Sequence, residues 1–284
     1  MCEPIMKKVK GDGLQINVAI WEGSGKPIIS VHGITANCRS WDVLASALSP
    51  RHRLIAMDLR GRGLSDKPQS GYSLEHHMRD IVCLMDELGL EQTVLMGHSL
   101  GAFISLAFGA QYPDRVDRLV LVDGAGKLSQ EQFDHVFAAI KPALDRLGKV
   151  FPSADDYINL MKSSPFIHPW SPAIEGYYLY ELENVEGGVR CNINPAHIQE
   201  ESGNVRKFEP DMFYSKVLSD VLILKATEGL VSQDDLLLPE AVVDRMVNEI
   251  PHAKRFDVEG VNHYGVVFQP HFERDREILG FLED

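Results

Sequence analysis

The chain has few cysteines, no long apolar run and no large basic cluster. Its four cysteines (Cys2, Cys38, Cys83 and Cys191) are widely scattered, without a C-x-x-C pair or a zinc-like spacing to histidine, so we expect reduced, mostly buried thiols. No segment approaches the roughly 18 apolar residues needed to cross a bilayer, and residues 1–7 lack the apolar stretch of a secretory signal. These absences predict a soluble cytoplasmic protein with no membrane partner.

The charge balance is strongly acidic. The chain carries 28 Lys and Arg against 41 Asp and Glu, a formal net charge of -13 at pH 7, and its longest basic cluster is the short segment Met6–Lys10. Such a charge repels nucleic-acid phosphates and anionic lipid headgroups. We therefore expect a small-molecule substrate rather than a nucleic-acid partner.

Short β-rich runs alternate with helix-like segments over most of the chain. This alternation predicts a mostly parallel, doubly wound sheet with crossover helices. The expected strands cover residues 14–21, 28–31, 54–57, 93–96, 119–122, 221–225 and 254–258. The expected helices cover residues 41–48, 73–88 and 240–250, with one between Ser99 and Tyr112 and a last one from about His271.

The alternation is interrupted between residues 128 and 206. This stretch has no convincing strand, several helix-length segments separated by prolines, and a high content of Phe, Tyr and Trp. We predict a helical cap at 128–206, inserted into an α/β core formed by residues 1–127 and 207–284. The aromatic side chains could form the cap's own small core or line a substrate pocket, and both uses are expected.

One pentapeptide, Gly97-His98-Ser99-Leu100-Gly101, lies between a strand-like and a helix-like apolar run. A G-x-S-x-G in that context is typical of a nucleophile elbow, a strained turn that exposes a serine hydroxyl. The glycines two residues to either side allow the strand and the helix to approach closely. Ser99 is therefore the candidate nucleophile.

Three further blocks accompany the pentapeptide in a fixed order: His32-Gly33, the segment Asp58–Asp66 (DLRGRGLSD), and Gly260-Val261-Asn262-His263. Together the four blocks resemble the α/β-hydrolase fold superfamily, in its capped branch of esterases and related hydrolases. The resemblance covers nearly the whole chain outside residues 128–206. It implies an eight-stranded, mostly parallel sheet with the cap inserted after the sixth strand.

A serine hydroxyl needs a neutral imidazole to accept its proton, and His263 follows the last predicted strand. The resemblance places this histidine over the elbow. It also implies that the side chain of His98 points away from the pocket and that His32 organises its loop. The histidines at 52, 76, 77, 135, 252 and 271 lie in helical or flanking contexts that favour solvent exposure.

The acid of the triad departs from the commonest family pattern. Relatives usually carry an aspartate after the seventh strand, where this chain has Ala226-Thr227-Glu228-Gly229. A smaller group uses a carboxylate at the end of the sixth strand, and Asp123 occupies that place. Asp123 is therefore the predicted acid; the remaining alternatives are Glu228 and, less favoured, Asp234 and Asp235.

The resemblance also implies an oxyanion hole made of the backbone N–H groups of Ile34 and Leu100, because the fold stabilises the developing charge with main-chain donors. Leu100 begins a helix, whose dipole favours negative charge. The segment Arg60–Gly63 is expected to be a structural turn, with Asp58 and Asp66 as ion-pair partners of its arginines. No cofactor and no metal are implied.

The sequence thus predicts a serine hydrolase that cleaves a carboxylic ester, lactone or activated amide through an acyl-enzyme on Ser99. The aromatic cap suggests a small to medium, partly apolar substrate. Two alternatives remain: a hydrolase of carbon-carbon bonds in diketone-like ring-cleavage products, and a ligand-binding protein that keeps the fold without catalysis. Haloalkane dehalogenase and epoxide hydrolase chemistry is disfavoured, since it requires a carboxylate at the position of Ser99.

Overall fold

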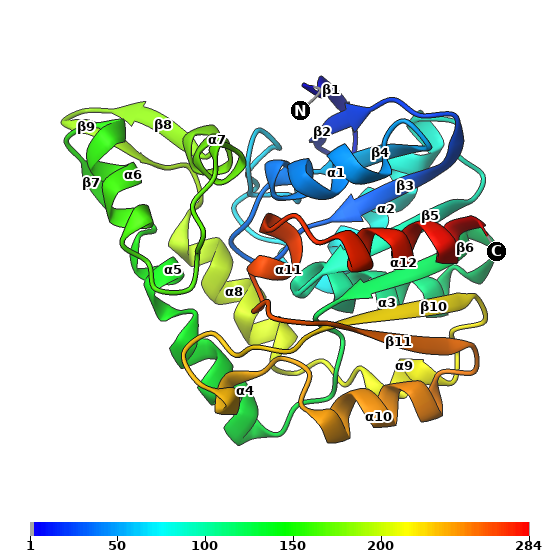
Figure 1. The fold of residues 1–284 in the computed structure, drawn as a ribbon. Coiled ribbons are helices and arrows are strands. Elements are labelled where there is room, and N and C mark those ends of the chain that lie inside the picture. The colour runs from blue at the N-terminus through cyan, green and yellow to red at the C-terminus, as the bar shows by residue number, and fades with distance from the viewer. Residues whose placement is uncertain (1–2, 284) are drawn as a thin grey trace.

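A computed structural model describes residues 3–283, and its centre is an eight-stranded sheet (Figure 1). The order is β1-β2-β4-β3-β5-β6-β10-β11; β1–β2 and β2–β4 pair antiparallel and all other pairs are parallel. The predicted fold class is confirmed. The strands are β1 (Ile5–Lys10), β2 (Gln15–Trp21), β3 (Gly25–Val31), β4 (His52–Met57), β5 (Thr93–His98), β6 (Val116–Val122), β10 (Asp220–Ala226) and β11 (Ala253–Val258).

The strand β1 was not predicted. It coincides with the lysine-rich segment near the N-terminus, and it is an edge strand in which five of the six residues are exposed. Because one edge of β1 has no neighbouring strand, its lysines disfavour pairing with another chain. An exposed edge strand needs little apolar content, so hydrophobic periodicity gave no signal for it.

Helices cover both faces of the sheet. One face packs against α1 (Asp42–Leu48), α11 (Gly265–Phe268) and α12 (Phe272–Glu283); the other packs against α2 (Leu74–Glu87), α3 (Leu100–Gln111), α9 (Asp211–Tyr214) and α10 (Glu240–Glu249). Neighbouring residues of one strand point to opposite faces, so Ile28 belongs to one apolar core and Ile29 to the other. Short 3-10 turns complete the core: η1 (Cys38–Trp41), η2 (Pro113–Arg115) and η3 (Gln233–Asp235).

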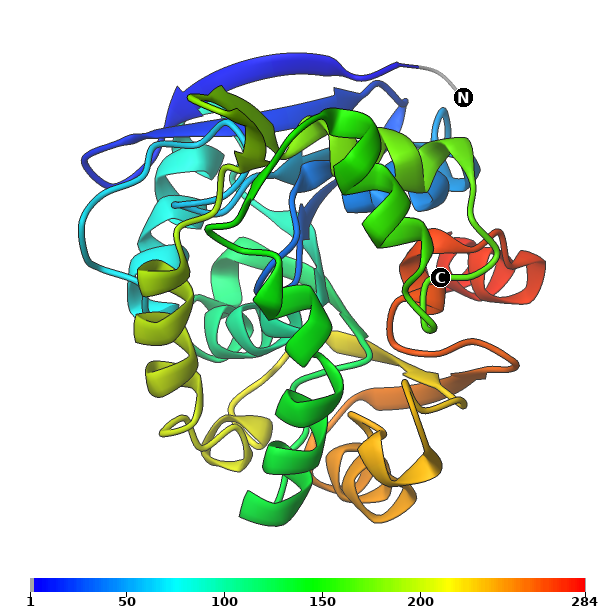
Figure 2. The same cartoon turned by 90° about the vertical axis from the view of Figure 1, so that its left-hand side faces the viewer.

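Residues 128–206, here called the insertion, lie between β6 and β10. The insertion contains α4 (Gln130–Ala139), α5 (Lys141–Asp145), α6 (Ala154–Lys162), α7 (Pro172–Tyr180) and α8 (Pro195–Val205). Figure 1 shows it to one side of the sheet, and Figure 2, viewed from that side, shows it in front of the sheet. The boundaries at 128 and 206, and the function as a cap, stay predictions.

The expectation that the insertion has no strand is wrong. It holds a small antiparallel sheet of order β7-β9-β8, formed by β7 (Val150–Phe151), β8 (Leu182–Val185) and β9 (Gly188–Cys191). Gly187, in the turn between β8 and β9, and Gly188, at the start of β9, both have positive φ. Glycine pairs are a hairpin signal, but strands this short leave no readable alternation.

Two further sequence expectations concern cysteine and membrane-spanning segments. Cys38 and Cys191 are buried free thiols and Cys83 is partly buried, whereas Cys2 lies outside the described residues. No helix within residues 3–283 is long and apolar enough to cross a bilayer.

The turn between β5 and α3 is the tightest junction of the core. A Cβ atom on Gly97 would lie 2.1 Å from the carbonyl oxygen of Gly101, and one on Gly101 would lie 1.9 Å from that of Val31. Neither distance is possible without moving backbone. Glycine at both positions is what lets the helix start directly above the strand.

We expect Gly101→Ala to destabilise the protein by about 3 kcal/mol or more, since the methyl group collides with a central strand. Chemical denaturation monitored by circular dichroism measures this. The matched control is Gly280→Ala in α12, where nothing lies within 4 Å of the added atom and stability should rise by roughly 0.5–1 kcal/mol. Equal effects of the two substitutions would contradict this account.

Candidate active site

Ser99 lies at the turn between β5 and α3, with φ 56° and ψ -118°. A residue other than glycine with positive φ is strained, and such strain is common where a side chain must be presented for chemistry. The loop after β3 lies directly beside it: a Cβ atom on Gly33 would be 3.3 Å from the Cβ of Ser99 and 3.7 Å from its Oγ. Ser99 therefore faces the loop that begins with His32-Gly33.

The structure brings His263 and Asp123 together from loops 140 residues apart. The Nδ1 atom of His263 lies 2.8 Å from Oδ2 of Asp123, and both side chains are buried. The other carboxylate oxygen of Asp123 accepts a hydrogen bond from the backbone N–H of Ala226 at 3.1 Å. With its proton held at Nδ1, the imidazole keeps Nε2 free to accept another.

The alternative acids have other partners. Glu228 accepts a hydrogen bond from the amide of Gln233, and Asp235 accepts three from the backbone N–H groups of Leu230, Val231 and Ser232. The backbone at Gly229 explains the departure from the common pattern, because a Cβ atom there would lie 1.7 Å from the carbonyl oxygen of Ser232. This loop is folded too tightly to present an aspartate at that position.

His98 packs directly against the candidate base. It is among the residues that line the cavity at Ser99, and its ring stacks on the ring of His263, with centroids 4.4 Å apart. Its Nε2 donates to the carbonyl oxygen of His263 at 2.9 Å. His98 therefore contacts both the ring and the backbone of His263. The only sequence feature that pointed to a role for His98 in the site is its position between Gly97 and Ser99 in the pentapeptide.

The backbone N–H groups of Ile34 and Leu100 are free for a ligand. Among residues 3–283, no carbonyl or side chain accepts a hydrogen bond from either. Leu100 is the first residue of α3, where the helix dipole adds positive potential. His32 organises the loop before Ile34: its Nδ1 donates to the carbonyl oxygen of Gly33 at 2.7 Å and its Nε2 accepts from the N–H of Leu59 at 3.0 Å.

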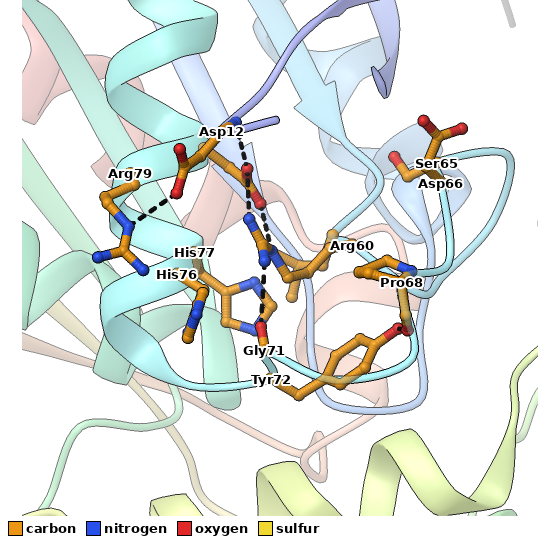
Figure 3. A network of polar contacts seen from close by, with 12 residues as sticks. Asp12, Arg60, Ser65, Asp66, Pro68, Gly71, Tyr72, His76, His77 and Arg79 are labelled. Atoms are coloured by element: carbon orange, nitrogen blue, oxygen red, sulfur yellow. Dashed lines mark hydrogen bonds and ion pairs between the residues drawn. The ribbon is translucent and has the colours of Figure 1, made fainter. Parts of the chain in front are cut away.

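The expected ion pairs of the Arg60–Gly63 turn are wrong. Arg60 pairs with Asp80 at 2.7 Å and donates to the carbonyl oxygen of Gly71 (Figure 3), while Arg62 pairs with Glu201 of the insertion. Asp58 instead accepts from Asn17, Tyr180 and the N–H groups of Cys38 and Leu64, and Asp66 accepts from the N–H of Gln15. No local sequence pattern predicts ion-pair partners that lie so far apart in the chain.

Two of the histidines expected to be exposed are buried, namely His52 and His77. His77 lies on α2 and its Nε2 donates to the carboxylate of Glu201, which connects α2 to α8. The expectation failed for His77 because the insertion covers this part of α2.

A cavity of about 400 Å³ lies between the insertion and the loops that follow the sheet strands. Ser99 and His263 line it together with aromatic residues of the insertion such as Phe133, Phe137 and Tyr177. Tyr157 and Tyr178, in contrast, are buried in the apolar core that the insertion shares with the sheet. Within residues 3–283, no group of three or more His, Cys, Asp or Glu side chains could hold a metal ion.

Comparison with known families assigns this architecture. The model of the α/β hydrolase fold family matches residues 26–270. The chain belongs to the α/β-hydrolase fold family. In this family a serine at the turn after the fifth strand and a histidine after the last strand are the expected catalytic pair.

Individual relatives include 2-(acetamidomethylene)succinate hydrolase of Mesorhizobium japonicum, 40% identical over 119 residues, which are 42% of this chain and 43% of the relative. Another is 2-hydroxy-6-oxo-2,4-heptadienoate hydrolase of Pseudomonas putida, 34% identical over 135 residues (45% of this chain, 48% of the relative). The matched segments thus span less than half of these curated relatives. A crystal structure of E-2-(acetamidomethylene)succinate hydrolase superposes with a TM-score of 0.85 at 27% identity, covering 99% of this chain and 100% of that one.

Three buried histidines have lowered pKa values. Burial lowers the pKa of His32 to about 4 and holds the pKa values of His77 and His98 well below 6.5. Since the unfolded chain binds these protons at higher pH than the folded one, the free energy of unfolding must fall as pH drops from about 6.5 toward 4.

We expect His32→Asn to reduce this pH dependence by up to about 1.4 kcal/mol per pH unit, the contribution of one proton. Urea denaturation at several pH values between 4 and 7 measures the slope. His135 is exposed on α4, so His135→Gln should leave the slope unchanged. An equal change in both variants would refute the role of buried His32.

Proposed function

We propose that this protein is a serine hydrolase that cleaves carboxylic esters or lactones through an acyl-enzyme on Ser99. The observation that carries the proposal is the 2.8 Å contact between His263 Nδ1 and buried Asp123, where His263 lines the same cavity as Ser99. The strained backbone at Ser99 and the free N–H groups of Ile34 and Leu100 support the same conclusion.

The proposed reaction has two halves. In the first, His263 accepts the proton of Ser99 as the hydroxyl oxygen attacks the carbonyl carbon, and then returns it to the leaving alcohol. In the second, His263 removes a proton from water as the water oxygen attacks the acyl carbon, and it then gives that proton to Ser99 Oγ as the bond to Ser99 breaks and the acid leaves. Asp123 holds the imidazole in the required tautomer and stabilises its protonated form.

Charge at the carbonyl oxygen is stabilised by main-chain donors in this mechanism. The N–H groups of Ile34 and Leu100 are the donors, and each such group contributes roughly 10²–10³ in rate in well-studied hydrolases. They act without moving, because α3 and the loop after β3 already hold them in place.

The cavity favours an uncharged, apolar substrate group. Among the described residues that line the cavity, the only lysine is Lys127 and the only arginine is Arg206. Lys127 pairs with Glu209, and Arg206 pairs with Asp134 at 2.9 Å. All four side chains are partly exposed. The deeper wall contains Ile140, Val267 and Phe268. A substrate carboxylate placed against that wall would lose hydration without gaining a partner.

A second candidate is the hydrolysis of carbon-carbon bonds in diketone-like compounds. The similarity to 2-hydroxy-6-oxo-2,4-heptadienoate hydrolase favours it, and the same three residues would serve. The names of both relatives denote carboxylate substrates, for which this cavity offers no unpaired cation. Ester or lactone hydrolysis is therefore preferred here.

A cytoplasmic location and the lack of a nucleic-acid partner stay predictions from the sequence.

Labelling with a fluorophosphonate probe tests the proposal. Wild-type protein should label and hydrolyse p-nitrophenyl butyrate, whereas Ser99→Ala should do neither. Asp123→Asn should lower kcat/KM by about 10³–10⁴, because the imidazole loses its tautomeric control. The control Glu228→Gln should change it less than about twofold. A wild-type protein that neither labels nor hydrolyses esters would favour a non-catalytic binding protein.

Substrate charge provides a separate comparison. We expect kcat/KM for p-nitrophenyl butyrate to exceed that for the p-nitrophenyl monoester of succinate by about 10-fold or more, since burying an unpaired carboxylate costs at least ~1–3 kcal/mol. Steady-state assays of both esters at the same ionic strength measure the ratio. A preference for the anionic ester would contradict the uncharged character of the cavity.

A further inference from the structure

Three consecutive carbonyl groups of the loop after β3 accept hydrogen bonds, the first from its own loop and the next two from arginines elsewhere in the chain. The carbonyl oxygen of Gly33 accepts from His32 Nδ1 at 2.7 Å and from the N–H of Ala36 at 3.1 Å. That of Ile34 accepts from Nε of Arg62 at 3.0 Å. That of Thr35 accepts from Nη2 of Arg146 at 3.1 Å.

Both arginines are themselves held by carboxylates of the insertion. Arg62 pairs with Glu201 on α8, and both side chains are fully buried. Arg146, which belongs to the insertion, makes two contacts of 3.0 Å with the two oxygens of Glu181, and both of these side chains are also buried. Such paired geometry leaves each guanidinium little freedom of rotation.

The contacts to Gly33 orient the N–H of Ile34 directly, and those of Arg62 and Arg146 restrain the peptide units that follow it. The carbonyl of Gly33 and the N–H of Ile34 belong to the same planar peptide unit, so fixing the carbonyl orients the N–H. The next two carbonyls fix the two peptide units that follow. The N–H of Ile34 has no acceptor within the described residues, so it is held in place while free to donate.

We propose that Arg62 and Arg146 are positioning residues that hold the N–H of Ile34 as an oxyanion donor, so that the insertion completes the oxyanion hole of the core. This inference rests on the proposed serine hydrolase function. Arg146 itself does not line the cavity. The insertion would then contribute to the rate of reaction through the backbone of the core as well as forming the wall of the cavity.

A purely stabilising role explains these pairs less well. Burying an ion pair costs desolvation that its attraction often fails to repay, and uncharged replacements of similar volume are frequently no less stable. The two arginines of these pairs donate to two neighbouring carbonyls of one loop, those of Ile34 and Thr35. What the two pairs have in common is that each restrains the backbone of that loop.

The test replaces one pair by uncharged side chains. The double variant Arg146→Met/Glu181→Gln removes the hydrogen bond from Arg146 to Thr35 without leaving a buried charge unpaired, and the Tyr177 hydroxyl, 3.5 Å from the same carbonyl oxygen, remains. We expect kcat for p-nitrophenyl butyrate to fall about 10-fold to 100-fold with KM changed less than about threefold, because the donor acts mainly in the transition state. A trifluoromethyl ketone, which forms a tetrahedral adduct with serine, should bind more weakly by a similar factor. Arg146→Lys should recover part of the loss.

The matched control is Arg60→Met/Asp80→Asn. This pair is equally buried, but Arg60 donates to Gly71 (Figure 3) rather than to the loop after β3. Its removal should leave kcat within about threefold of wild type, even if the melting temperature falls.

Hydrogen exchange of residues 33–36 provides a readout that does not depend on turnover. Exchange in this segment should accelerate in Arg146→Lys and in the Arg146→Met/Glu181→Gln variant, and remain unchanged in the control. If the double variant does not fold, Arg146→Lys alone decides, by its kcat and its exchange.

Unchanged kcat and exchange in the Arg146 variants would overturn the inference. An equal loss of kcat in the control would also overturn it, since that assigns both pairs to general stability. A wild-type protein without esterase activity would refute the proposed function instead; exchange in residues 33–36 would then decide whether the arginines hold the loop.

Discussion

The hydrogen bond between Asp123 and His263 is the interaction on which the arrangement of the site depends. It joins the loop after β6 to the loop after β11, and its length of 2.8 Å requires both loops to be positioned accurately. Parallel strands make this possible, because their carboxyl ends lie along one edge of the sheet. Asp123 has positive φ, and its second oxygen is held by the N–H of Ala226 on β10. The neighbouring strand thus keeps the carboxylate in place.

Around this bond, the site is constructed mainly from backbone. The N–H groups of Ile34 and Leu100 lack acceptors, while the surrounding carbonyls have donors, and His98 holds the carbonyl of His263. Buried polar groups cost least when their partners are already in place, and the buried arginines of this region, Arg62 and Arg146, each have a carboxylate partner. The insertion shares in this network through Glu181 and Glu201.

The parts of the fold and of the candidate site that depend on a local sequence pattern could be predicted. The alternation of apolar residues indicated the central strands and both layers of helices, and the glycines beside Ser99 indicated the close approach of β5 and α3. The strand β1 and the small sheet β7-β9-β8 escaped prediction because an exposed edge and two- to four-residue strands leave no periodicity. The partners of Arg60 and Arg62 escaped it because Asp80 and Glu201 are distant in sequence.

By itself, the sequence determined the class of fold, the strained serine turn and the short list of carboxylates from which an acid could come. These follow from periodicity and from the steric demands of glycine, which act over a few residues. Only the tertiary structure decided which carboxylate faces His263, that His98 lies against the same ring, and that arginines from two regions converge on one loop. The physical reason is that a hydrogen bond forms only at a suitable distance and direction between two atoms in space. The number of residues between two groups in the chain does not determine that distance or direction.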